Sequence, residues 1–574
     1  MTEAYRRVTR DLPERRALEK GGFATEQRAL RTWIDALPVA NFMVAAQRLL
    51  DGLRELNRQR LEGPRRLDAL EILRPAVIQL AAVADKQIVG ASFPLPPHKV
   101  ELGHLALGFQ AELALGYRLA LAEVCAPSGS VPLLRGKQVA LAAVRALRHA
   151  DEHLAKACLL YRTPPVGAWQ ALHDVYGFIA SLRLDDRSVD DASIGVELNA
   201  REAYGHALLF ALANPYRSTQ REQVDMFAFT RALAPFCDLR NGTAGLRDVT
   251  LHVDADRGPG YLPEERVATQ RDVLVLHLER LFAFVESQIA SVPDGGRTVA
   301  LRQRGGPTLQ VDLALLRRFV AALGNLGERV HARLGGGYML DTVLGLHDAH
   351  VVLAGAADFD GFMRRVSGHA ISLSDADRGP TWRHGSSENV RSTRLSARVL
   401  DQSLGGYRVV WERGAAGDNV RARVGELVAF ALPEANPDAK SDWMVGVIRW
   451  IRIDEIGRVD AGIELLARRA LAVGVRAIHG KPRSAMRGLL LASPATMGEE
   501  DYDSLIVSTE IDRETSDIEL TVPADIIGPP KAAHTRQEHG LRVIEATGIY
   551  QYFALPMADV PAALAQPIPM ELET

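Results

Sequence analysis

Five short segments rich in Val and Ile follow one another between residues 395 and 466, and turn-forming residues separate them. Strands of this length and spacing are typical of a small β-barrel or sandwich, so this stretch constrains the fold most. A polar stretch with Gly, Pro and Ser at residues 375–389 precedes it and predicts a linker. The predicted strands are Leu395–Leu400, Gly406–Trp411, Leu427–Leu432, Trp443–Ile453 and Val459–Leu466.

The segments on either side of this stretch differ in periodicity. Residues 1–240 place apolar side chains at spacings of three and four, interrupted by Pro and Gly, which predicts a helical bundle or short α-solenoid. Residues 241–374 are mixed α/β, residues 390–478 hold the barrel, and residues 479–574 form a small C-terminal β module. The predicted fold class is therefore multidomain α+β, with an all-α N-terminal region followed by β structure.

Two stretches of the mixed region are harder to interpret. The periodicity predicts a helix from about Asp312 to Leu334, ended by the glycines of residues 335–337. Residues 340–353 are largely apolar, and such a run fits a strand or a helix equally well.

Composition excludes several functional classes. The net charge is −3, with 68 basic and 71 acidic residues, so binding of a nucleic acid polymer through bulk charge is not expected. Three dispersed cysteines and the lack of a signal peptide or an apolar span predict a cytoplasmic protein without membrane insertion. No catalytic signature is recognisable, so we expect no enzyme and no cofactor.

One hairpin carries a recognisable chemical motif. Asp401, Ser403, Gly405 and Gly406 lie within the sequence DQSLGG, which fits D/N-x-S-x-x-G. A carboxylate and a hydroxyl can hydrogen-bond the polar edge of a guanine, and glycine lets a flat ligand approach the backbone. An ordinary tight turn uses the same residue types, so the motif alone does not decide.

The motif and the strands after it together resemble the PilZ-domain family. Segments 424–428 (VGELV), 446–450 (GVIRW) and 461–465 (AGIEL) are similar to that family's later strand motifs and occur in the same order. The resemblance implies a PilZ-type β-barrel, a bacterial signalling role and the second messenger cyclic di-GMP as ligand. The residues predicted to bind this ligand are Arg391, Arg394, Arg398, Asp401, Ser403, Gly405 and Gly406.

The arginine half of the family's site is displaced. The family's R-x-x-x-R motif usually precedes D/N-x-S-x-x-G by some distance, but Arg394 and Arg398 lie almost against Asp401. Two interpretations remain open. Arg391 and Arg394 grip the phosphates from a rearranged position, or the barrel has lost nucleotide binding and serves as a scaffold for protein contacts.

A weaker motif lies in the helical region. His149 and His153 are four residues apart on one predicted helix, a spacing that can chelate zinc, although no third ligand is evident. A solvated polar helix face is the simpler interpretation. A metal-dependent hydrolase is therefore only a remote alternative, and no metal site is predicted.

The leading functional hypothesis is a cyclic-di-GMP receptor. Its helical region would bind an unidentified protein partner, and the resemblance implies an output in motility, pili or surface adhesion. The alternative is a PilZ-like interaction scaffold that binds no nucleotide.

Overall fold

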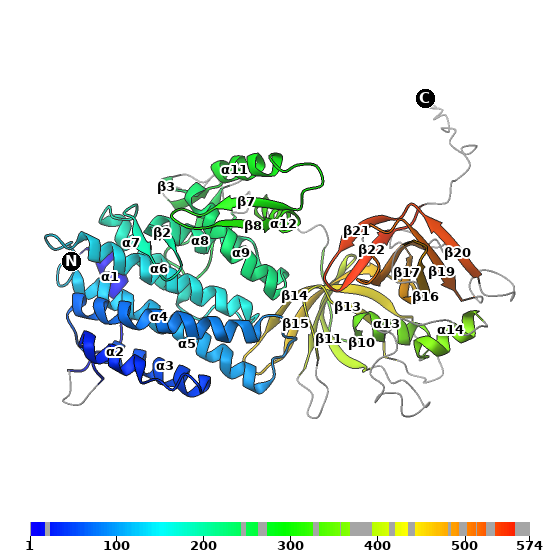
Figure 1. Ribbon diagram of the computed structural model, residues 1–574, viewed down its shortest axis with the longest axis horizontal. Coiled ribbons are helices and arrows are strands. Elements are labelled where there is room, and N and C mark those ends of the chain that lie inside the picture. The colour runs from blue at the N-terminus through cyan, green and yellow to red at the C-terminus, as the bar shows by residue number, and fades with distance from the viewer. Residues whose placement is uncertain are drawn as a thin grey trace. The chain divides into compact units, whose positions relative to one another are not determined.

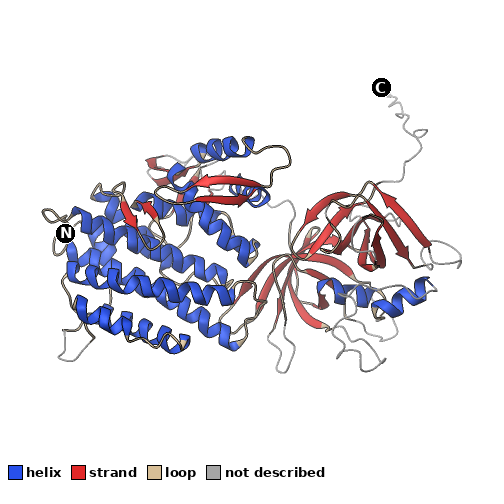
Figure 2. Ribbon diagram, viewed as in Figure 1, coloured by secondary structure: helices blue, strands red, loops and turns tan. Residues whose placement is uncertain are grey.

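The computed structural model divides into two compact units, residues 1–330 with 452–454 and residues 331–451 with 455–574. The first is mainly helical and the second is mainly built from strands (Figure 2). Within the described part of the chain, no helix combines the length and apolarity needed to cross a membrane. The structure describes residues 2–17, 23–242, 248–261, 273–324, 332–355, 357–367, 393–412, 420–433, 442–479, 484–492, 502–512, 514–523 and 534–556.

The core of the helical unit is a set of long helices, of which α4, α5 and α6 pack side by side (Figure 1). Capping boxes start two later helices, with Asn199 and Glu202 at α8 and Thr219 and Glu222 at α9. The helices are α1 (Glu3–Thr9), α2 (Gln27–Asp35), α3 (Phe42–Arg58), α4 (Gly63–Ile88), α5 (Pro97–Val124), α6 (Gly136–Leu159), α7 (Ala168–Ser181), α8 (Ala200–Leu212), α9 (Gln220–Leu233), α11 (Glu279–Ala290) and α12 (Leu313–Gly324), with short 3₁₀ turns at Pro215–Arg217 and Ala234–Phe236.

Small antiparallel sheets complete the helical unit. β1 and β2 form a hairpin, β7 and β8 form another, and a four-stranded sheet has the order β3-β6-β4-β5. The strands are β1 (Val189–Asp191), β2 (Val196–Leu198), β3 (Asp238–Gly242), β4 (Val249–Leu251), β5 (Gly260–Tyr261), β6 (Val273–His277), β7 (Thr298–Arg302) and β8 (Thr308–Asp312).

A buried ionic cluster fixes the β1–β2 hairpin against the helices. Asp191 accepts a hydrogen bond from Arg74 (Nη1–Oδ1 2.9 Å) and lies 3.1 Å from Arg145 Nη1 and 3.5 Å from Arg148 Nη1. Burial alone would raise the pKa of Asp191, but the hydrogen bond from Arg74 and the charges of Arg148 and Arg145 outweigh it and lower the pKa.

The second unit contains a closed six-stranded barrel. Its strands follow one another in the order β10-β13-β14-β15-β12-β11, and β11 pairs with β10 to close the ring. The short strand β9 pairs with the C-terminal part of β11, at Asp401 and Gln402. This confirms the predicted PilZ-type barrel, including all five strands predicted for it. The strands are β9 (Leu334–Gly335), β10 (Met339–Leu344), β11 (Leu395–Ser403), β12 (Gly406–Trp411), β13 (Leu427–Ala431), β14 (Met444–Ile453) and β15 (Val459–Ala467).

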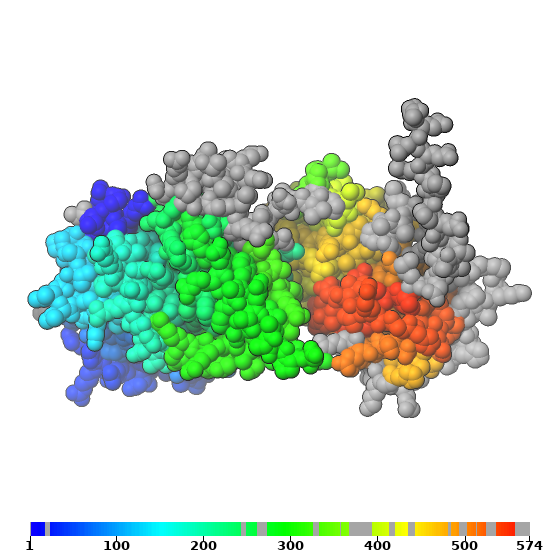
Figure 3. All heavy atoms as spheres, turned by 90° about the horizontal axis from the view of Figure 1, so that it is seen from above, coloured from blue at the N-terminus to red at the C-terminus, as the bar shows by residue number. Residues whose placement is uncertain are grey.

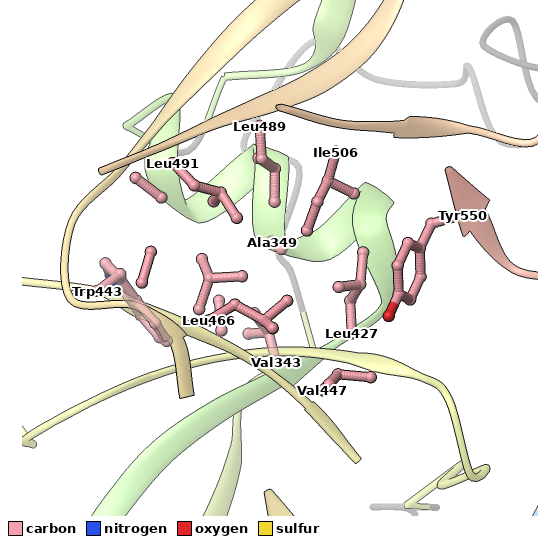
Figure 4. Close-up of a cluster of buried hydrophobic side chains, with 14 of the residues drawn as sticks. Val343, Ala349, Leu427, Trp443, Val447, Leu466, Leu489, Leu491, Ile506 and Tyr550 are labelled. Atoms are coloured by element: carbon pink, nitrogen blue, oxygen red, sulfur yellow. The ribbon is translucent and has the colours of Figure 1, made fainter. Parts of the chain in front are cut away.

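A second sheet packs against the barrel through a shared apolar core. Val447 of the barrel, Leu489 and Ile506 of the second sheet and Ala349 of α13 all lie in one cluster (Figure 4). Helices α13 (Gly345–Leu353) and α14 (Phe359–Ser367) belong to the insertion between β10 and β11. The second sheet has the order β20-β19-β16-β17-β18-β22-β21. Its strands are β16 (Ala470–Ala477), β17 (Met486–Ala492), β18 (Tyr502–Ser508), β19 (Asp517–Val522), β20 (His534–His539), β21 (Arg542–Ala546) and β22 (Tyr550–Ala554).

The helix predicted from Asp312 to Leu334 is wrong at its C-terminal end. Helix α12 ends at Gly324, and Leu334 lies in strand β9. The glycines that follow serve a close approach of backbones, because a Cβ on Gly336 would lie 2.4 Å from the Val399 carbonyl oxygen of β11.

The predicted domain limits remain a prediction, but the strand pairings bear on them. β9 and β10, from the predicted mixed region, pair with β11 of the barrel. β16, inside the predicted barrel range of 390–478, pairs with β17 and β19 of the second sheet. The linker predicted at 375–389 lies outside the described residues. We propose limits near residue 332 and residue 467 for the barrel.

Candidate functional site

The D-x-S-x-x-G motif forms the hairpin between β11 and β12. Ser403 and Gly406 are paired at its end, and the side chain of Leu404 at the tip is exposed. Gly406 has a steric reason to be glycine, since an added Cβ would lie 2.1 Å from the carbonyl oxygen of Ile463. The backbone nitrogen of Leu465 donates to the Gly405 carbonyl at 3.0 Å. Both glycines therefore hold the hairpin flat against β15.

The motif carboxylate lies between two arginines. Arg333 Nη1 is 2.8 Å from Asp401 Oδ1, and Arg408 Nη1 is 3.9 Å from Asp401 Oδ2. Arg408 also makes a bidentate pair with Asp460, at 3.0 and 2.6 Å. The hydrogen bond to Asp460 raises the pKa of Arg408, although partial burial opposes it. Two guanidinium groups thus flank the motif on one face of the barrel.

An indole lies beside these charged groups. Trp450 of β14 lies on Gly462 of β15, where an added Cβ would come within 2.0 Å of the indole nitrogen. The guanidinium carbon of Arg408 is 5.9 Å from the Trp450 ring centroid. This contact explains two motifs together, because the AGIEL motif needs a glycine where the tryptophan of the GVIRW motif lies on the backbone. A half-buried aromatic ring next to a guanidinium is chemically suited to stacking with a nucleobase.

A second polar row crosses the same strands toward the C-terminal sheet. Glu464 is paired with Gly406 across β12 and β15, and it forms an ion pair with Arg449. Arg449 also makes a bidentate pair with Glu545 of β21, at 2.8 and 3.1 Å. In Figure 3 the C-terminal strands, in red, lie against the barrel strands, in yellow. The C-terminal sheet is therefore linked to the motif hairpin through Arg449 and Glu464.

The structure brings together only part of the predicted site. Asp401, Ser403, Gly405 and Gly406 lie in one hairpin, as their sequence requires. Two of the three predicted arginines are engaged elsewhere. Arg394 lies over the Trp443 ring at 5.4 Å, and Arg398 forms an ion pair with Glu412 at 2.7 Å. Arg391 falls outside the described residues. Ligand binding by these residues remains a prediction.

Sequence reasoning missed Arg333, although the sequence contains a signal for it. Arg329 and Arg333 form an R-x-x-x-R motif in the sequence RVHAR, directly before β9. The motif escaped notice because the insertion with α13 and α14 separates it from Asp401 along the chain. Pairing of Gly335 with Asp401 and of Leu334 with Gln402 brings Arg333 back to the hairpin. Arg329 lies outside the described residues.

In the histidine pair of the helical region, His149 is not available as a zinc ligand, because both nitrogens of its ring have protein partners. The His149 ring is fully buried, with Nδ1 2.7 Å from the side-chain oxygen of Gln110 and Nε2 accepting a hydrogen bond from Arg74 at 2.9 Å. Burial and the neighbouring arginines lower the pKa of His149 well below its usual value. Among the described residues, no group of three possible metal ligands is present.

Comparison with known proteins agrees with the fold and the motif. The family model "Cyclic-di-GMP receptor FimW, N-terminal domain" matches residues 28–244, and "Cyclic-di-GMP receptor FimW, middle PilZ domain" matches residues 374–471. The chain belongs to the PilZ-domain family. It is similar to one characterised relative, the cyclic-di-GMP receptor FimW of Pseudomonas aeruginosa PAO1, with 25% identity over 519 residues and 82% of each chain covered.

Proposed function

We propose that this protein is a cyclic-di-GMP receptor that binds its ligand on the barrel face around Asp401. The observation that carries the proposal is the ion pair between Asp401 of the D-x-S-x-x-G hairpin and Arg333 of an R-x-x-x-R motif. In this proposal, the ion pair joins the two halves of the family's site. The similarity to the receptor FimW along most of the chain supports the same function.

The chemistry of this face suits a cyclic dinucleotide. Arg333 and Arg408 are held by carboxylates, and a phosphate can replace a carboxylate as the bidentate partner of a guanidinium. Their side chains are 42% and 37% exposed, so this exchange needs no opening of a core. Asp401 and Ser403 would then meet the polar edge of a guanine, and Trp450 offers a ring for stacking.

The downstream role remains part of the proposal. We infer a cytoplasmic, non-catalytic protein whose helical unit passes the signal to a protein partner in motility, pili or surface adhesion. The name of the relative supports the receptor function, and the identity of the partner is open. The metal-dependent hydrolase loses its motif, since both ring nitrogens of His149 have protein partners.

Calorimetric titration of the full-length protein with cyclic di-GMP tests the proposal. We expect saturable binding that Asp401→Ala abolishes. Glu412→Ala is the matched control, because Glu412, directly after β12, is also a carboxylate and pairs with Arg398 of β11. We expect it to bind like the wild type. Absence of heat with the wild-type protein would refute the receptor and favour the scaffold that binds no nucleotide.

A further inference from the structure

A cavity of about 860 Å³ lies in the helical unit, away from the ionic cluster at Asp191. Helices α1 and α7, which pack against each other, form part of its wall. Strands β3, β4 and β6, residues 252–255 after β4, Asp185 and Arg201 also line it. Its volume falls within the range of pockets that hold small organic molecules. The D-x-S-x-x-G hairpin contributes nothing to its lining.

A glycine in the middle of α7 opens this wall. Gly177 is exposed between the buried residues Tyr176 and Phe178, and an added Cβ would meet nothing within 4 Å. Glycine inside a helix costs stability relative to alanine, and here no neighbouring atom requires its small size. The effect of this residue is therefore to keep the cavity wall concave.

The charged groups at the cavity are paired with one another. Arg7 Nη1 is 2.5 Å from Asp254 Oδ1, and Arg201 Nη2 is 2.7 Å from Asp185 Oδ2. Carboxylates nevertheless outnumber arginines in the lining, which holds four of them, at Glu3, Asp174, Asp185 and Asp254. An anion that displaced one of the paired carboxylates would therefore meet the others, and this excess of negative charge disfavours it.

Two further polar side chains of the wall, Asp174 and His173, also have protein partners. Asp174 pairs with Arg10 at 3.3 Å. The His173 ring nitrogens lie 2.7 Å from the Tyr204 hydroxyl and 2.9 Å from the Arg257 carbonyl oxygen. Burial lowers the pKa of His173, so its imidazole is neutral. Between these groups the lining is apolar, with Leu239, Leu251, Val253, Val273, Leu274 and Ala180.

We propose that this cavity binds a small uncharged organic molecule with a largely apolar body. The volume admits such a molecule, the apolar part of the lining stabilises it, and the excess of carboxylates over arginines disfavours an anion. This site is separate from the proposed cyclic-di-GMP site and would give the helical unit a ligand of its own.

Fluorescence titration of the full-length protein tests the site. The probe is N-phenyl-1-naphthylamine, which is uncharged, and its anionic counterpart 8-anilinonaphthalene-1-sulfonate serves as the comparison. We expect saturable binding of the uncharged probe and roughly tenfold weaker binding of the anion, because carboxylates outnumber arginines in the lining. Lack of saturable binding of the uncharged probe, or equal affinity for both probes, would overturn the proposal.

Two substitutions at one position locate the binding. Gly177→Leu places a side chain in the cavity and should weaken probe binding at least about tenfold. Gly177→Ala makes the same improvement to the helix but adds a single methyl group, and it should bind the probe almost as the wild type does. Unchanged binding in Gly177→Leu refutes the assignment.

A substitution in a second wall of the cavity covers the case in which Gly177→Leu fails to fold. If circular dichroism shows that Gly177→Leu has lost helix, Ala4→Phe fills the cavity from α1 instead and should weaken binding to a similar extent. Cyclic-di-GMP titration of the same variants should be unchanged, since their barrel is intact. Wild-type probe binding in a folded Ala4→Phe protein would equally refute the site.

Discussion

Around Asp191 in the helical unit, the ion-pairing side chains are almost fully buried, with Asp191 at 0% and Arg74 at 3% exposure. Around Asp401 on the barrel, the same kinds of group are partly open, with Asp401 at 22% and Arg333 at 42%. The chemistry of the two clusters is alike, but their access to water differs.

This difference separates a structural cluster from one that can exchange partners. A buried charge that loses its partner has no water to replace it, so the Asp191 cluster is locked in place. A partly exposed pair contributes little to stability and can release its partner at small cost. The arginines at Asp401 are therefore available to an anionic ligand, whereas those at Asp191 are not.

The largest expected effect breaks the buried cluster. Asp191→Asn leaves three buried arginines without their shared carboxylate and should lower the free energy of unfolding by about 3–5 kcal/mol. Urea unfolding of the full-length protein measures this. Asp190→Asn, at the exposed neighbouring residue, should change stability by less than about 0.5 kcal/mol. Similar losses in both variants would show that the cluster has no special role.

The corresponding change on the barrel should affect binding rather than stability. Arg333→Ala should weaken cyclic-di-GMP binding roughly 10- to 100-fold, the value of one hydrogen bond to a charged group, and alter stability by less than about 1 kcal/mol. Calorimetry and thermal unfolding measure the two effects. Arg476→Ala, which breaks a similarly exposed ion pair with Glu519 between β16 and β19 of the second sheet, is the control and should bind normally. If Arg333→Ala lost as much stability as Asp191→Asn, the contrast between the two ionic clusters would be refuted.

A buried histidine extends the comparison to pH. Burial, together with the charge of Arg487, lowers the pKa of His350 from 6.5 to about 3. The folded protein then keeps this ring neutral while the unfolded chain takes up a proton below pH 6.5. Stability should fall with acidification, by about 2 kcal/mol from this group at pH 5.

Urea unfolding at pH 7 and pH 5 checks the prediction for His350. His350→Gln should lose less stability between the two pH values than the wild type. His347→Gln is the control at an exposed ring on the same helix, and its pH dependence should equal that of the wild type. If His350→Gln lost as much stability between pH 7 and pH 5 as the wild type, the prediction would be contradicted.

The smallest effect concerns the row of contacts to the C-terminal sheet. Glu545→Gln removes one carboxylate from Arg449, which keeps Glu464, so stability should fall by about 0.5–1 kcal/mol. Thermal unfolding measures it. Glu538→Gln, at the opposite edge of the sheet, is the control. A large loss of cyclic-di-GMP affinity in Glu545→Gln would instead make the C-terminal sheet part of the binding site.

The barrel strands could be predicted because each is short, apolar and bounded by turn residues. Strand β10 could not, because the apolar run of residues 340–353 changes from strand to helix at Gly345, where φ is +88°. Apolar residues on both sides of this glycine hide the change, because β10 and α13 are each too short to show a clear period.

Only the local half of the candidate site could be predicted from the sequence. Asp401, Ser403 and Gly406 are neighbours in sequence, so a local motif finds them. Arg333 reaches Asp401 only through the pairing of β9 with β11, which no local pattern encodes. A search for R-x-x-x-R without a distance limit would have found it.

Closure of the barrel by β10 decides where this chain can be cut. A fragment that starts in the predicted linker at residues 375–389 would lack β9 and β10, so β11 and β13 would each present an open hydrogen-bonding edge. Such a fragment invites edge-to-edge association between molecules. A fragment that begins before residue 329 keeps the ring closed and retains both arginines of the R-x-x-x-R motif, so it is the piece suited to isolated ligand studies.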